Sequence, residues 1–281
     1  MCLNHSFAVI GGDARQRCLA QQLRAQGRAV SVYRVPGMDD SPGGLSGSIR
    51  DADVLILPMP ALESADSVRS ADGGIPLAAL PAAASPGTLI CGGMLGAAVP
   101  ALRGAGLRVF DYAEDETLLL ENAELTAEAA LRLLLTHLPK PLMGSQIRIC
   151  GFGRIGMLLA RKLQALGAHV TIAARRPQAL TLAGLLGYTA EAFREQTDGC
   201  ERFDAVVNTV PAEVVSAAQL AALRPDCVLL ELASLPGGFC PEASAHAGYL
   251  NGRGLPGKYA PQAAAAVIQK AIFRQLELEG A

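Results

Sequence analysis

Apolar residues along the chain fall into short runs separated by stretches with helical spacing. Runs at 7–10, 54–57 and 228–231 are typical of strands that are buried on both faces of a sheet. In the stretches between such runs, apolar positions recur every three or four residues, which predicts amphipathic helices. Helices are predicted at 14–26, 76–80, 99–103, 177–186 and 216–223. Strands that alternate with helices over this length predict an α/β protein with parallel sheets and helices on both faces.

The chain also resembles itself. At a shift of 140 residues the following pairs are identical: Gly11 and Gly151, Leu19 and Leu159, Leu23 and Leu163, Gly27 and Gly167, and Val30 and Val170. The shift is about half of the 281 residues, which is the pattern of two copies of one structural unit. We therefore expect two tandem doubly wound Rossmann-like domains with parallel sheets, linked by long hinge helices.

Two long amphipathic stretches, at 121–138 and 261–278, predict the hinge helices. We expect an N-terminal Rossmann-like substrate domain at 1–120 and a linker helix at 121–142. A nucleotide-binding Rossmann domain is expected at 143–258, and a C-terminal helix at 259–281 that packs back across the hinge. Because ligands commonly bind at domain boundaries and at the carboxyl ends of parallel strands, the cleft between the domains is the expected site.

The strongest motif is the G-x-G-x-x-G of residues 151–156, which follows one predicted strand, opens a helix and precedes a second strand at 170–174. In such a unit Gly151 permits the turn, Gly153 lets the backbone approach a pyrophosphate, and Gly156 lets the helix pack on the strand. The first helical residues, Arg154 and Ile155, then offer N–H groups to the phosphates. The alternative is a glycine-rich turn that binds nothing.

The end of the second strand indicates which dinucleotide binds. An NAD site usually carries an acidic residue there, bonded to the ribose 2′-hydroxyl. This chain has Arg175 and Arg176 instead, whose guanidinium groups can bind the 2′-phosphate of NADP. The alternative is a pair of solvated arginines before a helix that begins with Pro177. We favour NADP over NAD.

The corresponding turn of the first copy lacks two glycines, because Asp13 and Gln16 replace them. A carboxylate at that turn would repel a pyrophosphate, so we expect no dinucleotide there. Asp13 is expected to cap the helix and leave Arg15 and the first-turn N–H groups free for a small acid. The alternative is that Asp13 only caps the helix and Arg15 is solvated.

Loops after the predicted strands supply the other candidates. Those of the second half are Asn208, Thr209, Val210, Pro211, Ala233, Ser234 and Lys258. Those of the first half are Gly12, Asp13, Arg15, Gln16, Gly92, Gly93, Asn122 and Thr126. Each has a structural alternative, since such residues also finish strands, cap helices or lie solvated in loops. Arg15 and Lys258 are the first candidates for an acidic substrate, which needs cations or helix ends.

Composition excludes several classes of function. A net charge of −2 without a basic run argues against a nucleic-acid partner, and no run of about 20 apolar residues predicts a membrane span. Seven cysteines without a C-x-x-C pair argue against a zinc site or a disulfide framework; we expect no metal and a cytoplasmic location. A 2-hydroxy acid dehydrogenase needs an arginine where Ala233 and Ser234 stand, and a later histidine. His246 lies in a stretch with helical spacing at 242–247, so an alcohol–ketone oxidoreductase is disfavoured.

Six motifs together resemble the A subunit of dipicolinate synthase, a family of endospore-forming bacteria. They lie at 9–16, 151–156, 173–175, 208–211, 231–238 and 254–261. The resemblance extends from about residue 7 to about residue 276, and the first and last motifs are more specific than the glycine fingerprint. One departure is Glu231, where the family pattern has aspartate.

The resemblance implies an oxidoreductase that converts dihydrodipicolinate to dipicolinate with NADP by hydride transfer, in spore formation. It also implies a partner, the flavoprotein-like B subunit of dipicolinate synthase, and a homo-oligomer is expected. Asp13 or a water would accept the proton, and Lys258 is the second catalytic candidate. Gly12, Arg15, Gln16, Asn122, Thr126 and Ser234 would bind the small di-acid. Alternatives are a non-catalytic NADP-binding regulatory or scaffold protein, an NADP-dependent dehydrogenase of another small cyclic acid, and a reductase running the opposite way.

Overall fold

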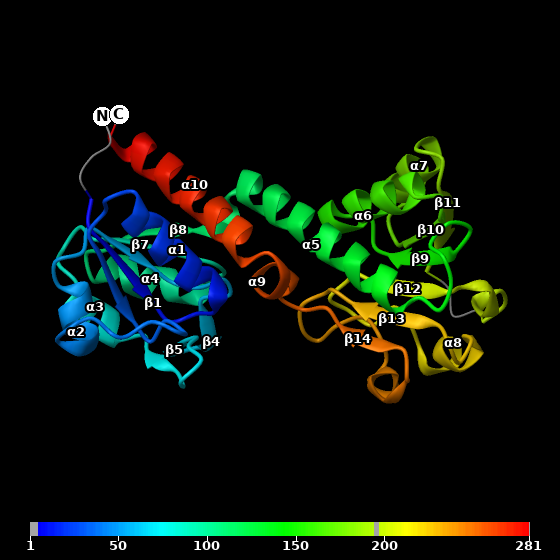
Figure 1. The fold of residues 1–281 in the computed structure, drawn as a ribbon, viewed down its shortest axis with the longest axis horizontal. Helices are drawn as coiled ribbons and strands as arrows, with labels where there is room; N and C mark the ends of the chain where they lie inside the picture. The colour runs from blue at the N-terminus through cyan, green and yellow to red at the C-terminus, as the bar shows by residue number, and fades with distance from the viewer. Residues whose placement is uncertain (1–4, 194–196, 281) are drawn as a thin grey trace. The chain divides into compact units, whose positions relative to one another are not determined.

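The computed structural model describes residues 5–193 and 197–280, and the chain divides into two compact units (Figure 1). The first unit contains residues 1–122 and 257–281, and the second contains residues 123–256. They are called the first and second domains below. The first domain thus takes its residues from both ends of the chain.

The first domain is built on a parallel sheet of five strands in the order β2-β1-β3-β7-β8. These strands are β1 (Phe7–Ile10), β2 (Val30–Tyr33), β3 (Val54–Ile56), β7 (Leu89–Gly92) and β8 (Arg108–Asp111). Every residue of β1, β3 and β7 is buried, as expected for central strands with helices on both faces. The chain leaves β1 for β2 on one side and returns to β3 on the other, so the direction of winding reverses between β1 and β3.

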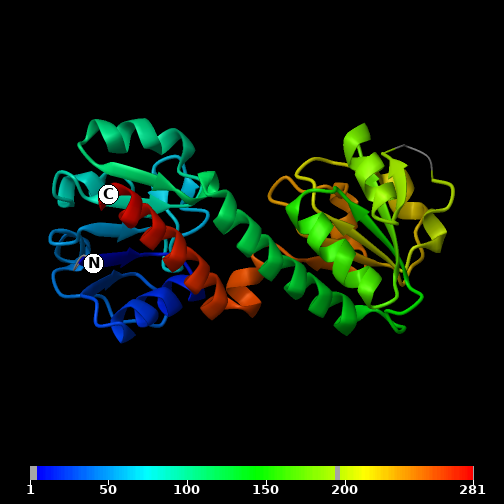
Figure 2. The same cartoon turned by 90° about the horizontal axis from the view of Figure 1, so that it is seen from above.

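Helices of the first domain come from both ends of the chain. They are α1 (Ala14–Ala25), α2 (Gly44–Ile49), α3 (Ala79–Ala83), α4 (Val99–Gly104) and α10 (Pro261–Gly280), with short 3₁₀ turns η1 (Gly96–Ala98) and η2 (Tyr112–Glu114). The short helix α9 (Leu255–Tyr259) begins in the second domain and ends in the first. Helix α10 packs along α1, as Figure 2 shows. Its Phe273 lies against Phe7 of β1, with ring centroids 6.2 Å apart. This contact joins the last helix to the first strand.

The first domain also contains a small antiparallel sheet that the sequence did not predict. Its strands are β4 (Leu62–Ser64), β5 (Ser67–Val68) and β6 (Ile75–Pro76). Strands of two or three residues are too short to show a hydrophobic period, which is why the pattern missed them. The helix predicted at 76–80 is wrong in position, because residues 75–76 pair as a strand and α3 begins at Ala79.

The second domain is built on six parallel strands in the order β11-β10-β9-β12-β13-β14. These strands are β9 (Gln146–Cys150), β10 (His169–Ala174), β11 (Thr189–Ala192), β12 (Ala205–Asn208), β13 (Val228–Glu231) and β14 (Tyr249–Asn251). Numbered within the domain, this is the order 3-2-1-4-5-6 of a dinucleotide-binding fold. Winding reverses between β9 and β12.

Helices of the second domain are α6 (Arg154–Ala165), α7 (Pro177–Leu185) and α8 (Ala217–Ala222), with 3₁₀ turns η3 (Cys200–Arg202) and η4 (Pro241–Ala245). The segment at 242–247 was expected to be helical, but the structure has only the 3₁₀ turn η4 there. The long helix α5 (Glu116–His137) begins before its predicted start. Its first seven residues belong to the first domain, and its buried Ala127, Ala130 and Leu134 pack in the core of the second.

The repeat predicted from the sequence is present in the strand order. With β11 left out, β10-β9-β12-β13-β14 of the second domain matches β2-β1-β3-β7-β8 of the first, strand for strand. The predicted class of two doubly wound α/β domains is therefore confirmed. Ligands of such sheets bind outside the carboxyl ends of the strands where the winding reverses. In each domain that point is the turn after the first strand.

Candidate functional site

The turn after β9 contains three glycines, two of which are required by packing within the protein. Gly151 has φ +97, and a Cβ built on it would lie 2.3 Å from Thr209 Oγ1. A Cβ on Gly156 would lie 2.4 Å from the backbone oxygen of Gly151. Both distances are far below van der Waals contact. These two glycines thus let α6 and the loop after β12 close on the turn, as the fingerprint predicts.

Close packing within the protein does not explain the glycine at position 153. Its φ is −93, which any residue adopts, and a Cβ on it would meet no atom within 4 Å. It is the N-cap residue of α6 and, having no side chain, makes no capping hydrogen bond to the first turn of that helix. An open helix N-terminus attracts anions through its N–H groups and its dipole. Arg154 lies exposed beside this turn, while Ile155 packs partly against the core. The turn before α6 is therefore a candidate site for an anionic ligand.

Two cations follow β10, the strand next to the glycine turn. Arg175 and Arg176 are both exposed, and Arg176 is the N-cap of α7 with Pro177 as the first helical residue. Among the described residues, neither arginine forms an ion pair. The turn at the end of β10 thus presents positive charge where NAD-specific sites present a carboxylate.

On the other side of the glycine turn, Asn208 and Thr209 use their side chains within the protein. The buried Asn208 donates from Nδ2 to the backbone oxygen of Val210 at 2.9 Å, and its Oδ1 accepts from the Val210 N–H at 3.1 Å. Thr209 Oγ1 donates to the backbone oxygen of Cys150 at 2.8 Å. Val210 contacts the same turn, because a Cβ on Gly151 would lie 2.9 Å from Val210 Cγ2, and Pro211 is exposed. The side-chain hydrogen bonds of Asn208 and Thr209 thus shape the turn.

Glu231 was not predicted as a functional residue. It ends β13, beside Asn208 of β12, and is 1% exposed. Its Oε1 accepts from Asn208 Nδ2 at 2.7 Å and from the Ala233 N–H at 2.9 Å, and its Oε2 accepts from the Gly238 N–H at 2.8 Å. Arg253 Nη2 lies 3.9 Å from Oε2, and Arg253 Nε donates to the Ala233 carbonyl at 2.8 Å. Only a carboxylate at the end of a buried strand pointed to this role in the sequence.

In the first domain, the turn after β1 is closed by its own side chains. Asp13 is the N-cap of α1, and its Oδ1 accepts from the Arg15 N–H at 2.9 Å. Gln16 Oε1 accepts from the Asp13 N–H at 3.0 Å, which completes a capping box. The Gly12 N–H donates to the Arg69 carbonyl at 2.9 Å. Asp13 caps the helix as predicted, but the expectation that the first-turn N–H groups are free is wrong, because the capping box uses them.

Arg15 is also paired rather than free. Its Nε and Nη2 donate to the Asp13 carboxylate at 3.0 and 2.8 Å, and Nη2 donates to the Met59 carbonyl at 2.6 Å. Burial alone raises the pKa of Asp13, but the hydrogen bonds and charge of Arg15, with the charge of Arg69, lower it below its ordinary value. Asp13 is therefore a weak proton acceptor. Arg15 Nη1 forms no hydrogen bond among the described residues.

The remaining candidate residues of the first half differ in their burial and in their hydrogen bonds. Gln16 is fully buried, and its Nε2 has no hydrogen-bond partner among the described residues. A Cβ on Gly257 would lie 3.0 Å from Asp13 Oδ2, so α9 packs against the Asp13–Arg15 pair, and Lys258 of α9 is exposed. Asn122 and Thr126 lie on α5, and each takes part in an interaction. In the second domain, Ala233 is buried and Ser234 is exposed.

Cysteines do not contribute reactive groups to this turn. The described cysteines are free and buried. Burial raises the pKa of Cys150, which ends β9, to about 12, and that of Cys227 to about 12. Such thiols stay protonated at neutral pH. Within residues 5–193 and 197–280 no group of three or more histidine, cysteine or acidic side chains is placed to hold a metal ion. Over the same ranges no helix is long and apolar enough to cross a membrane.

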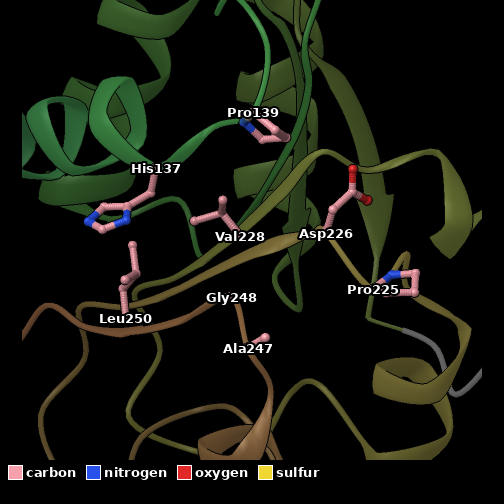
Figure 3. A pocket seen from close by; sticks show the side chains of 8 residues that line it. All are labelled: His137, Pro139, Pro225, Asp226, Val228, Ala247, Gly248 and Leu250. Carbon is pink, nitrogen blue, oxygen red and sulfur yellow. The ribbon is translucent and has the colours of Figure 1, made fainter.

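A cavity of about 260 Å³ lies elsewhere in the second domain (Figure 3). It is lined by His137, Pro139, Pro225, Asp226, Val228, Ala247, Gly248 and Leu250. Val228 is the first residue of β13, so the cavity lies at the amino ends of the strands. The glycine turn follows the carboxyl end of β9, at the opposite edge of the sheet. The cavity is therefore separate from the candidate site.

Comparisons with known proteins agree with this division of the chain. Residues 6–113 match the family model for the N-terminal domain of the dipicolinate synthase A subunit. Residues 126–234 match the model of the D-isomer specific 2-hydroxyacid dehydrogenase, NAD binding domain. The second domain is thus a nicotinamide-dinucleotide-binding domain of the dehydrogenase class.

Similarity to dipicolinate synthase A subunits extends over nearly the whole chain. It is 28% identical over 288 residues to the dipicolinate synthase A subunit of Bacillus subtilis (strain 168), covering 96% of this chain and 95% of the relative. The crystal structure of the same Bacillus subtilis protein matches with 26% identity and a TM-score of 0.80, over 99% of this chain and 97% of that one. The A subunit from Bacillus halodurans has the same fold, with 24% identity and a TM-score of 0.83 over 98% and 99% of the two chains. The chain resembles the A subunit of dipicolinate synthase along nearly its whole length, as the motifs predicted.

Proposed function

We propose that this protein oxidises dihydrodipicolinate to dipicolinate, using NADP, as the A subunit of a dipicolinate synthase. The single observation that carries the dehydrogenase part is Gly153, a glycine at an open helix N-terminus that neither φ nor packing requires. The substrate is taken from the similarity to the dipicolinate synthase A subunit over 96% of the chain. The reaction removes one hydride and one proton from a dihydropyridine di-acid and leaves an aromatic ring.

The second domain has residues that fit NADP. The first-turn N–H groups of α6 would hold the pyrophosphate, with Gly153 giving it room. Arg175 and Arg176 would hold the 2′-phosphate, since both are exposed and follow the strand that lies next to the turn. When bound, the nicotinamide accepts the hydride. The residues that would line the cofactor are Gly151, Gly153, Arg154, Ile155, Gly156, Arg175, Arg176, Asn208, Thr209, Val210, Pro211 and Ala233.

In the first domain, Arg15 is our candidate for binding a substrate carboxylate. Asp13 and the Met59 carbonyl hold its Nε and Nη2, and its Nη1 would donate to the substrate carboxylate. The buried Gln16 Nε2 is a second donor that needs an acceptor. We propose that Asp13 positions Arg15 and leaves the proton to water, because the low pKa of Asp13 makes it a poor base. Gly12, Asn122, Thr126, Ser234 and Lys258 remain candidates for further contacts with the di-acid.

The similarity to the dipicolinate synthase A subunit also supports proposals about a partner protein, a cellular role and a location. The name of the relative, which designates one subunit of a synthase, indicates a second polypeptide, and we propose that this is a flavoprotein-like B subunit. We further propose a role in spore formation, a cytoplasmic location and a homo-oligomeric state. To test both the partner and the oligomer, tagged protein is mixed with the B subunit, and the mass of the complex is measured by light scattering.

The decisive experiment mixes the protein with NADP and freshly prepared dihydrodipicolinate, with and without the B subunit. We expect dipicolinate absorbance and NADPH to rise together in equal amounts. Tight NADP binding with no product in either mixture would contradict the proposal and support a non-catalytic regulatory or scaffold protein. Consumption of NADPH when it is supplied with an unsaturated ring acid would instead indicate a reductase.

A further inference from the structure

The Glu231 carboxylate joins two loops that follow neighbouring strands. Through Asn208 it fixes the loop after β12, and through the Ala233 and Gly238 N–H groups it fixes the loop after β13. Thr209 attaches the first of these loops to the glycine turn, with its N–H and Oγ1 both on the Cys150 carbonyl at 2.9 and 2.8 Å. One buried carboxylate therefore sets both loops relative to the turn that would hold the pyrophosphate.

Two glycines of the second loop are explained by this contact. Gly237 has φ +95, and a Cβ on it would lie 2.8 Å from Glu231 Oε2. A Cβ on Gly238 would lie 2.4 Å from Asn208 Nδ2. Both glycines are buried, so the loop wraps closely around the Glu231–Asn208 pair. Any side chain at these positions would move the loop.

The position of the loops indicates which half of a dinucleotide they would meet. The pyrophosphate of such cofactors lies at the turn between β9 and β12, where the winding reverses. The adenosine half then extends over β10, whose end carries Arg175 and Arg176. The nicotinamide half must extend the other way, over β12 and β13. The loops that Glu231 joins are the ones that follow these two strands.

We propose that Glu231 is a positioning residue for the nicotinamide half of the cofactor, an inference that rests on the proposed function. A carboxylate suits the position because three N–H donors converge on its two oxygens. A glutamine has one oxygen, so its amide NH₂ would face another donor, either at Gly238 or at Asn208 and Ala233. The loops would then shift, and a displacement of about 1 Å is enough to misplace a reacting ring.

The test compares two probes on the full-length protein. NADPH contains the nicotinamide ring, whereas 2′-phospho-ADP-ribose lacks only that ring and keeps both riboses, the 2′-phosphate and the pyrophosphate. Binding of each is measured by calorimetry for the wild type, Glu231→Gln and the exposed control Glu201→Gln, with the fluorescence of bound NADPH as a second readout. If the wild type prefers NADH, then NADH and ADP-ribose take their places.

For Glu231→Gln we expect NADPH affinity to fall roughly tenfold while affinity for the fragment changes by less than about twofold. The enhanced fluorescence of bound NADPH should fall as well, and Glu201→Gln should match the wild type. An equal loss for both probes, or no loss for either, would overturn the inference. Failure of the wild type to bind NADPH or NADH would instead refute the proposed function.

If Glu231→Gln does not fold, a second variant, Gly238→Ala, tests the positioning role of Glu231. Gly238→Ala keeps the carboxylate and displaces the same loop through the Asn208 side chain, so it should weaken NADPH more than the fragment. Melting curves of both variants report folding. If neither variant folds, the inference is overturned, because Glu231 then holds the domain together rather than setting two loops.

Discussion

Helices α1 and α6 begin at equivalent turns of the two copies, yet one N-terminus is closed and the other open. At α1 the Asp13 and Gln16 side chains occupy the N–H groups in a capping box. At α6 the matching residues are Gly153 and Gly156, which have no side chains to form a capping box. Two positions thus decide whether the same strand–turn–helix unit caps its own helix or leaves the cap position without a side chain.

The closed turn of α1 and the open turn of α6 each have a disadvantage that the other lacks. A capping side chain in place of glycine stabilises a helix by only a few tenths of a kcal/mol, and the open turn forgoes that stability. In exchange, the open turn keeps its N–H groups and dipole for phosphate. Stability and binding should therefore respond in opposite directions when one turn is converted toward the other.

The largest effect is expected from Gly153→Asp, which gives α6 the cap residue of α1. The new carboxylate has room, since no atom lies within 4 Å of a Cβ there, and it would face the pyrophosphate. Like charges about 4 Å apart near a protein surface repel by about 4 kcal/mol, so NADP affinity should fall at least about 100-fold. Thermal unfolding should show a domain as stable as the wild type or more stable by only a few tenths of a kcal/mol. Retained NADP affinity in a calorimetric titration would refute the open-turn site.

A smaller effect is expected from Gly156→Ala. Its Cβ would meet the Gly151 carbonyl at 2.4 Å, and backbone cannot move aside as a flexible side chain can. Crowding of this kind typically costs about 1–3 kcal/mol, measured as a shift of the urea midpoint. Gly153→Ala is the matched control, because the same methyl group enters open space and should cost less than about 1 kcal/mol. Equal losses in the two variants would show that Gly156 is not a packing glycine.

An effect of comparable size, on cofactor affinity rather than stability, is expected from Arg175→Asp. Charge-assisted hydrogen bonds to a phosphate are worth about 1.5–3 kcal/mol, so NADP affinity should fall about 10- to 100-fold. NAD affinity should stay within about threefold, since a carboxylate there can accept from the ribose hydroxyl. The control is Arg161→Asp, an exposed residue of α6 that makes the same change in net charge. A parallel fall in NAD affinity would mean that Arg175 does not read the 2′-phosphate.

The pattern of apolar residues and glycines in the sequence predicts much of this fold. It does not predict the side-chain contacts that close the turn of α1. The sheet strands are buried apolar runs, and the repeated Gly11 and Gly151 place both turns correctly. The sequence predicts that Asp13 caps α1, because capping needs only neighbours along the chain. Gln16 turning back to the Asp13 N–H, and Asp13 engaging the Arg15 guanidinium, depend on side-chain directions that spacing does not reveal.

The hydrogen bonds of Glu231 could not be predicted either, because they too depend on the tertiary structure. Its partners Asn208 and Gly238 are 23 and 7 residues away, and only the parallel register of β12 and β13 brings them together. In the sequence, Glu231 is one carboxylate at the end of an apolar run. A buried acid at a strand end, followed within seven residues by paired glycines, is the pattern that could have indicated it.

The smallest effect is expected at the closed turn, from Asp13→Asn. Asparagine can still cap α1 but loses the charge that faces Arg15, and the Asp13 side chain is 46% exposed, so solvent weakens the pair. We expect a loss of about 1 kcal/mol at pH 7. Because the pKa of Asp13 is lowered in the folded state, its contribution is present above the ordinary value of 3.8 and disappears as the pH falls through the folded value. The stabilities of wild type and variant, measured by urea unfolding from pH 7 to pH 3, should therefore converge at low pH. A constant difference would mean that the Asp13 charge does not stabilise the turn, and the contrast with α6 would then rest on geometry alone.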